Sequence, residues 1–138
     1  MSSYILDTHI IVWFLENNQR LPENIREDIE YMQHEYCVSF LSLIEIDNLR
    51  KLGKIKLQMS FSEIIQQLGD SFIGIYFGNT KDLEVLDSLD MKTIDRKIHG
   101  DYIDRMLVAI SIAHKHIMIS ADKKFPYYRE NGLRLLEI

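Results

Sequence analysis

The sequence has one cysteine, no long apolar run and no excess of basic residues, and each shortage excludes a class of protein. The single thiol, Cys37, cannot form a disulfide within the chain or a zinc site built from several cysteines. We therefore expect a reducing compartment and a cytoplasmic location. The longest early apolar run, residues 10–15, is too short to span a bilayer, and no basic segment precedes it. We expect no membrane association.

The charge balance is acidic, with 21 Asp and Glu against 16 Lys and Arg and a formal net charge of -5. This balance argues against a protein that binds nucleic acid simply by being basic. It does not exclude a metal site, because such a site gathers several carboxylates before the ion arrives. The 138 residues, 46% of them hydrophobic, suit one domain with its own core, and no linker or repeat interrupts them. We treat residues 1–138 as a single domain.

Short apolar runs alternate with helix-like segments along the chain. Runs rich in β-branched and aromatic residues predict buried strands near residues 4–7, 36–40, 71–77, 116–119 and 133–138. Amphipathic or capped segments predict helices near residues 8–15, where Thr8 is the expected cap, and near 22–33, 42–52, 61–68, from 80 onward, and 101–114. Such alternation is typical of parallel βαβ units, so we expect an α/β fold with a five-stranded parallel sheet.

Acidic residues stand where these strands end or where helices begin. The carboxyl ends of parallel strands share one edge of the sheet, and open α/β sheets bind ligands there. Carboxylates gathered at that edge repel one another unless they share a proton or a cation. Mg²⁺ and Mn²⁺ prefer oxygen ligands and keep coordinated water, which can attack a phosphodiester. The candidate ligands are Asp7, Glu45, Asp104 and Asp122, and the neighbouring hydroxyls of Thr8 and Ser120 could hold a metal-bound water.

Each acid also has a purely structural explanation. Ser42-x-x-Glu45 has the spacing of a capping box, and Asp101-x-x-Asp104 places a carboxylate in the first turn after a good helix cap. The two aspartates that follow strands could simply begin turns. Four acids placed independently at the one edge where ligands bind would be a coincidence. Taken together, they favour a divalent-metal site.

The ordered set of motifs resembles the PIN-domain ribonucleases, and in particular the VapC-like toxins of bacterial type II toxin–antitoxin pairs. The matching segments are residues 4–9, 42–46 with 52–55 after them, 99–107 and 119–122. The resemblance implies a three-layer α/β/α sandwich and Mg²⁺- or Mn²⁺-dependent cleavage of RNA by the four carboxylates, with the two hydroxyls in support. It also implies a cognate antitoxin encoded nearby, and a homodimer.

Some positions depart from the pattern of this family. Relatives often have tryptophan and lysine where this chain has Ile44 and Leu49, and an aromatic–proline pair where it has Tyr102-Ile103. These departures concern contacts with the substrate rather than the four acids. A solvated helix end explains the basic cluster after residue 49 equally well. The candidate RNA contacts are Arg50, Lys51, His99, Lys123 and Lys124.

Three other classes of protein compete with a nuclease. A phosphoacceptor receiver domain needs paired acids after its first strand, whereas Thr8 follows Asp7 here. A haloacid-dehalogenase-type phosphatase needs a second aspartate at the position that His9 occupies. The stronger alternative is a non-enzymatic binding module built on the PIN fold. A nuclease assay with magnesium separates these classes.

Overall fold

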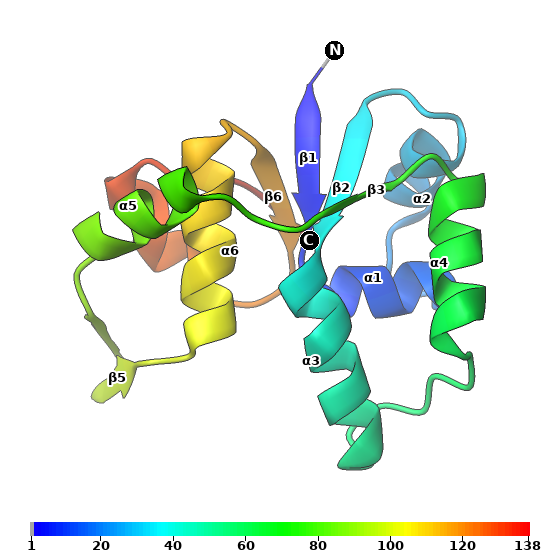
Figure 1. The fold of residues 1–138 in the computed structure, drawn as a ribbon, viewed down its shortest axis with the longest axis horizontal. Coiled ribbons are helices and arrows are strands. Elements are labelled where there is room, and N and C mark those ends of the chain that lie inside the picture. The colour runs from blue at the N-terminus through cyan, green and yellow to red at the C-terminus, as the bar shows by residue number, and fades with distance from the viewer. Residues whose placement is uncertain (1) are drawn as a thin grey trace.

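A five-stranded parallel sheet forms the centre of the computed structural model, which describes residues 2–138 (Figure 1). The order across the sheet is β3-β2-β1-β6-β7, and every neighbouring pair is parallel. This confirms the expected α/β sheet. The strands are β1 (Ser3–Leu6), β2 (Glu35–Ser39), β3 (Gly74–Tyr76), β6 (Ile117–Ser120) and β7 (Arg134–Glu137).

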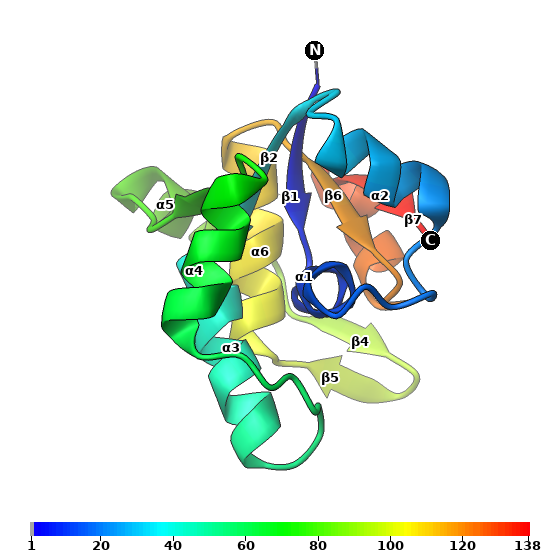
Figure 2. The same ribbon diagram turned by 90° about the vertical axis from the view of Figure 1, so that its right-hand side faces the viewer.

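Helices cover both faces of this sheet, as Figures 1 and 2 show from two sides. One face carries α1 (Thr8–Leu15), α2 (Glu23–Glu30) and α4 (Phe61–Asp70), and the other carries α5 (Thr80–Ser88), α6 (Tyr102–Ala113) and the 3₁₀ helix η1 (Phe125–Asn131). Helix α3 (Phe40–Lys51) extends past the carboxyl ends of the strands. The predicted three-layer α/β/α sandwich is therefore confirmed.

Two hydrophobic cores, one on each face of the sheet, hold the layers together. Neighbouring side chains of β1 point to opposite faces, so Leu6 belongs to the core under α1, α2 and α4, and Ile5 belongs to the core under α6. Both side chains are fully buried. None of the helices within residues 2–138 is long and apolar enough to cross a membrane.

Strand β1 lies where the direction of the chain across the sheet reverses. The chain goes from β1 to β2 and β3 on one side, and then returns to β6 on the other side of β1. In open α/β sheets this switch point leaves a crevice outside the carboxyl ends of the strands, and ligands bind there. Because Leu6 pairs with Ile119, β1 and β6 end side by side at this crevice.

Two of the predicted helix caps are wrong. Ser39, and not Ser42, caps α3, because β2 runs into the helix with no loop between them and the Ser39 side chain accepts a hydrogen bond from the Leu41 amide at 3.1 Å. Ser42 therefore lies inside the helix, and no capping box joins it to Glu45. At the start of α1, Asp7 caps the helix in place of Thr8.

Between α5 and α6 the chain forms a β-hairpin that the sequence pattern does not predict. Its strands β4 (Lys92–Ile94) and β5 (Lys97–His99) are antiparallel, and Asp95 and Arg96 form the turn with φ of 52° and 65°. Three-residue strands are too short to give a periodic signal, and glycine or asparagine is usual in such a turn. The predicted strand at residues 71–77 is also shortened to β3, because Ser71 and Phe72 complete the turn after α4.

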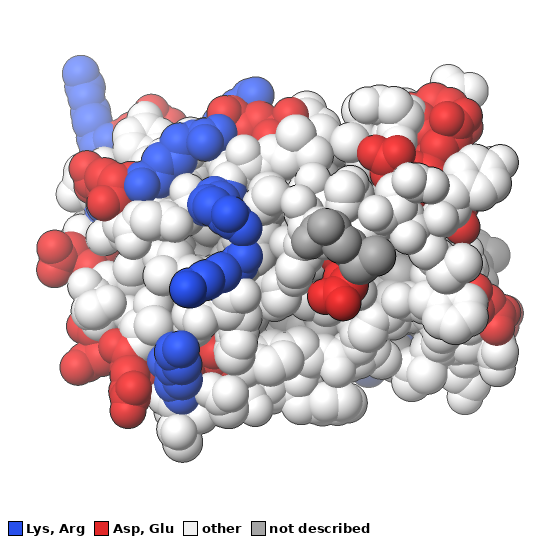
Figure 3. All heavy atoms as spheres, turned by 90° about the horizontal axis from the view of Figure 1, so that it is seen from above, with Lys and Arg blue, Asp and Glu red and all other residues white. Residues whose placement is uncertain are grey.

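The edge at the amino ends of the strands has a different character from the carboxyl edge. Figure 3 looks onto this edge, and basic side chains gather over one side of it. Lys115 precedes β6 there, and its carbonyl accepts a hydrogen bond from Arg134 of β7 at 2.7 Å. These two cations therefore lie at the opposite end of the sheet from the predicted carboxylates.

Candidate metal centre

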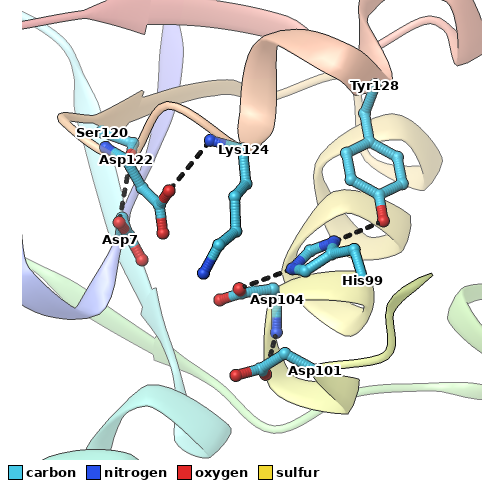
Figure 4. A network of polar contacts seen from close by, with 8 residues as sticks. All are labelled: Asp7, His99, Asp101, Asp104, Ser120, Asp122, Lys124 and Tyr128. Carbon is cyan, nitrogen blue, oxygen red and sulfur yellow. Dashed lines mark hydrogen bonds and ion pairs between the residues drawn. The ribbon is translucent and has the colours of Figure 1, made fainter. Parts of the chain in front are cut away.

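Asp7 directly follows β1 and is held by three elements. Its amide donates to the Ile119 carbonyl at 3.1 Å, which continues the pairing of β1 with β6. One carboxylate oxygen accepts from the Thr8 amide at 2.7 Å. The other accepts from the Ser120 hydroxyl, also at 2.7 Å (Figure 4). The residue is only 5% exposed. The ends of β1 and β6 and the start of α1 therefore fix the orientation of this carboxylate.

Burial raises the pKa of Asp7 to about 6, since the ionised form loses its hydration. The hydrogen bonds from Ser120 and Thr8 and the charge of His9 oppose this shift, and the negative charge of Asp122 adds to it. Asp7 is thus a buried acid with a second carboxylate close enough to alter its titration.

Asp104 lies in the first turn of α6, which Asp101 caps by accepting the Asp104 amide at 3.0 Å. Its carboxylate is 3.0 Å from Nε2 of His99, and Nδ1 of His99 is 2.7 Å from the Tyr128 hydroxyl (Figure 4). All three side chains of this row are buried. The row ties the hairpin and η1 to α6 and holds the Asp104 carboxylate in one orientation.

The pKa of Asp104 rises to about 8, first through burial and then through the charges of four nearby acids. These acids, in decreasing order of effect, are Asp101, Asp7, Asp122 and Glu45. The pKa of His99 is lowered, chiefly by burial and by the positive charge of Lys124, so the imidazole is neutral near pH 7. A protonated Asp104 can therefore donate its hydrogen bond to this neutral imidazole.

Asp122 follows β6 and is linked to Asp7 through one hydroxyl. The Asp122 amide donates to Ser120 Oγ at 2.9 Å, and this oxygen in turn donates to Asp7. The Asp122 carboxylate accepts the Lys124 amide at 2.9 Å, which turns the chain toward η1. The Lys124 side chain then lies between Asp122 and Asp104 (Figure 4).

Two hollows contain three of the four predicted acids, and Asp104 lines neither of them. Glu45 of α3 and Asp101 line a hollow of about 500 Å³ between α3 and the start of α6. Asp7 and Asp122 line a smaller hollow of about 270 Å³ beside His9. The structure thus brings the predicted acids to one edge of the sheet, and Glu45 approaches them from the α3 side.

The donor chemistry fits a small hard cation. Within residues 2–138, no three His, Cys, Asp or Glu side chains lie close enough together to hold one ion. Mg²⁺ keeps several waters and takes only one or two carboxylates directly, so fewer than three of these side chains would contact it. The Thr8 hydroxyl beside Asp7 is buried without a hydrogen-bond partner, which costs about 1–3 kcal/mol, so a metal-bound water there would satisfy it. The ligand set remains a prediction.

The predicted RNA contacts differ in their exposure and in the partners they already have within the protein. Arg50 hydrogen-bonds the Met59 carbonyl and lies over the Phe61 ring at 4.8 Å, and it shares Asp47 with Lys51. This part of the basic cluster therefore stabilises α3 and the segment after it. The predicted substrate contact His99 is buried against Asp104, whereas Lys123 and Lys124 are exposed.

The sequence does not reveal Tyr128 as a member of the centre, because its contact with His99 joins residues 29 positions apart. Asp101 carries a clearer signal, since its spacing to Asp104 is that of a cap and an acid in the first helical turn. That spacing predicts the start of the helix, but it does not predict that the charge of Asp101 raises the pKa of Asp104.

Together, the sheet and these side chains define an open α/β domain with an acidic centre at its switch point. The sequence profile of the PIN domain matches residues 4–131, and the chain belongs to the PIN-domain family. The resemblance found in the sequence motifs is thereby confirmed.

Three known proteins are similar to this chain over almost its whole length. The chain is 24% identical over 129 residues to Ribonuclease VapC22 of Mycobacterium tuberculosis, covering 94% of both chains. It is similar in fold to VapBC2 from Rickettsia felis bound to a promoter DNA fragment, with a TM-score of 0.70, 17% identity and coverage of 99% and 98% of the two chains. VapBC-1 from nontypeable Haemophilus influenzae gives a TM-score of 0.68, 19% identity and coverage of 98% and 97%.

Proposed function

We propose that this chain is a Mg²⁺- or Mn²⁺-dependent endoribonuclease, acting in the cytoplasm as a single PIN-like nuclease domain over residues 1–138. The observation that carries the proposal is the gathering of acids at the carboxyl edge of the sheet, where Ser120 links Asp7 to Asp122 and the charges of both contribute to the raised pKa of Asp104. Acids that perturb one another in this way at a sheet's switch point are suited to share a cation. Membership of the PIN-domain family and the ribonuclease name of the Mycobacterium relative support the same function.

The residues present define the roles in this reaction. A divalent ion held by one or two of the carboxylates Asp7, Glu45, Asp104 and Asp122, and by the others through water, would acidify a water molecule and stabilise charge on the phosphate oxygens. Ser120 keeps Asp7 and Asp122 in a fixed relation through its two hydrogen bonds. The row of His99 and Tyr128 holds Asp104 in place. The Asp104 carboxyl would lose its proton when a bound cation favours the ionised form. The Thr8 hydroxyl is suited to orient the attacking water.

A nuclease assay tests this function directly. Purified protein, incubated with labelled single-stranded and structured RNAs, should cut them in millimolar Mg²⁺ or Mn²⁺ and should stop when a chelator is added. Wild-type cleavage that continues unchanged in excess chelator would contradict the metal mechanism. RNA that is bound and never cut, with either metal, would support a non-enzymatic binding module instead.

We further propose that the protein is the toxin of a toxin–antitoxin pair, as the VapBC names of its structural neighbours suggest. Between α3 and α4 lies an apolar groove of about 330 Å³, lined by Phe40, Leu43, Ile44, Asp47, Phe61 and Ile65. Ile44 and Asp47 of α3 also line the acidic hollow that contains Glu45, so the groove and this hollow adjoin. An antitoxin segment could fill the groove with apolar side chains and reach the carboxylates with a basic one, which would compete with the metal.

Growth experiments test the toxin assignment. Expression of the chain alone should slow growth, and co-expression of the protein encoded beside it should restore growth. Ile65→Glu, which places a charge in the apolar groove on a half-exposed side chain of α4, should abolish this rescue while toxicity persists. Harmless expression of protein that cuts RNA in vitro would count against the toxin role.

A homodimer is the remaining proposal about assembly. Another hollow, between α3, α5 and α6, is partly lined by Phe77 and Leu83, which are 72% and 56% exposed. Burying these two side chains against a second copy would remove apolar surface from water. We expect sedimentation to give a dimer for the wild type and a monomer for Phe77→Glu. A wild type that is monomeric at tens of micromolar contradicts this assembly.

A further inference from the structure

The β4–β5 hairpin continues the carboxyl edge of the sheet beside the start of α6 (Figures 1 and 2). A hollow of about 550 Å³ lies against it, lined by Ile94, Asp95, Lys97, Ile98, His99, Gly100, Asp101 and Lys124. Asp101 also lines the hollow that contains Glu45. The hairpin hollow and the Glu45 hollow therefore adjoin at Asp101.

The hairpin brings positive charge to this acidic edge. Arg96 and Lys97 of the hairpin, and Lys124 at the start of η1, are exposed. Within residues 2–138, none of these three cations takes part in an ion pair. Asp95 is the opposing charge on the hairpin itself. A polyanion repelled by the four carboxylates would meet its counter-charges here, in a protein of net negative charge.

The base of the hairpin is fixed to the centre, and its tip is held in an uncommon conformation. Ile94 is buried, Lys92 pairs with Glu130, and His99 bridges Asp104 and Tyr128. Any ligand held by the hairpin is therefore placed relative to the Asp104 carboxylate. At the tip, Asp95 and Arg96 both have positive φ, which is uncommon for residues other than glycine, and the Arg96 side chain lies at this turn.

We propose that the hairpin and Lys124 form a phosphate-binding clamp that holds the backbone of single-stranded RNA beside the carboxylates. Arg96, Lys97 and Lys124 would each contact a phosphate, and the 68% exposed Ile98 would offer apolar surface to a base. This inference rests on the proposed nuclease function. It assigns RNA rather than protein to this hollow, because the apolar groove suited to a peptide lies on the other side of α3.

Charge-removing variants test the clamp. RNA binding is measured by fluorescence anisotropy against salt, in an Asp104→Asn background with Mg²⁺ so that the probe, a labelled single-stranded RNA, stays intact. Lys97→Gln, Lys124→Gln and Arg96→Gly should each weaken binding several-fold and reduce the slope of log affinity against log salt by about 0.7. Glycine at position 96 preserves the turn, because it accepts positive φ readily.

A matched control and a rescue variant separate the clamp from general electrostatics. Lys115→Gln removes the same charge at the opposite edge of the sheet and should leave binding and its salt slope unchanged. Lys97→Arg should restore the binding that Lys97→Gln loses. In the active protein, Lys97→Gln should raise KM much more than it lowers kcat, and thermal melts show whether each variant is folded.

Failure of the clamp can be told apart from failure of the nuclease function. RNA cleavage by the wild type, together with hairpin variants that match Lys115→Gln, would overturn the clamp alone. RNA binding that depends on the hairpin, without cleavage by the wild type, would support the clamp and remove the nuclease function. Variants that keep RNA binding but lose binding to the neighbouring protein would reassign the hairpin to protein docking and overturn this inference.

Discussion

Asp104→Asn should reduce RNA cleavage by at least about 100-fold while the protein keeps its fold. Partners that merely orient metal ligands are worth about 10–100-fold, and loss of a direct ligand should cost no less. Asparagine has nearly the same shape and keeps an oxygen and an amide that can face His99. Helix α6 still begins normally, because its cap uses the backbone amide of residue 104. The initial rate of RNA cleavage in saturating Mg²⁺ measures the loss.

A remote acid provides the matched control for this substitution. Asp87 is exposed on α5, so Asp87→Asn removes one carboxylate without touching the acidic centre. We expect Asp87→Asn to cut RNA at the wild-type rate. If Asp104→Asn also cuts at the wild-type rate, Asp104 is not a ligand and the proposed centre is wrong.

Much of this architecture follows from local sequence patterns. The β-branched runs around Ile5, Val38 and Met118 predict buried strands, and each becomes one of the central strands of the sheet. Because the intervening segments are helical, parallel pairing follows, and the predicted acids come to the carboxyl edge. Asp7 and Asp122 are predictable for this reason, since Asp7 directly follows β1 and Asp122 comes two residues after β6.

What the patterns do not predict depends on contacts between distant residues. The basic character of Arg50 suggests an RNA contact, yet its guanidinium packs on Phe61, and nothing near residue 50 indicates that packing. Tyr128 reaches the centre only because η1 folds back over the hairpin. Ser39 caps α3 in place of Ser42 because β2 leads straight into the helix, and the boundary between them has no signal in the sequence.

In a chelator, the wild type should lose stability as the pH rises from about 4 to about 8. Asp7 and Asp104 have folded-state pKa values raised from 3.8 to about 6 and about 8. Between 3.8 and these values the folded protein holds protons that the unfolded chain has released. The free energy of unfolding therefore falls as pH rises through this window, and it levels off above the folded pKa of Asp104. Each tenfold change in proton affinity corresponds to about 1.4 kcal/mol, so we expect a fall of several kcal/mol, measured by urea unfolding at a series of pH values.

Asp104→Asn should remove most of this pH dependence and should melt several degrees above the wild type at pH 8 in chelator. The substitution takes away the buried charge that Asp101, Asp7, Asp122 and Glu45 oppose. Asp7→Asn is a poorer test, because both Asp7 oxygens accept hydrogen bonds and the amide can replace only one acceptor. The exposed Asp87→Asn should melt like the wild type at every pH.

Added Mg²⁺ should reverse the loss in the wild type, since an ion that binds only the folded state stabilises it by an amount that grows with the logarithm of free metal. Asp104→Asn should gain less from the same ion, so its advantage over the wild type should shrink as the metal concentration rises. Mn²⁺ should act in the same direction. The same arrangement of carboxylates then causes both the lower stability of the metal-free protein and its affinity for metal. A wild type whose stability responds neither to pH in this window nor to millimolar metal would mean that the acids do not share a site.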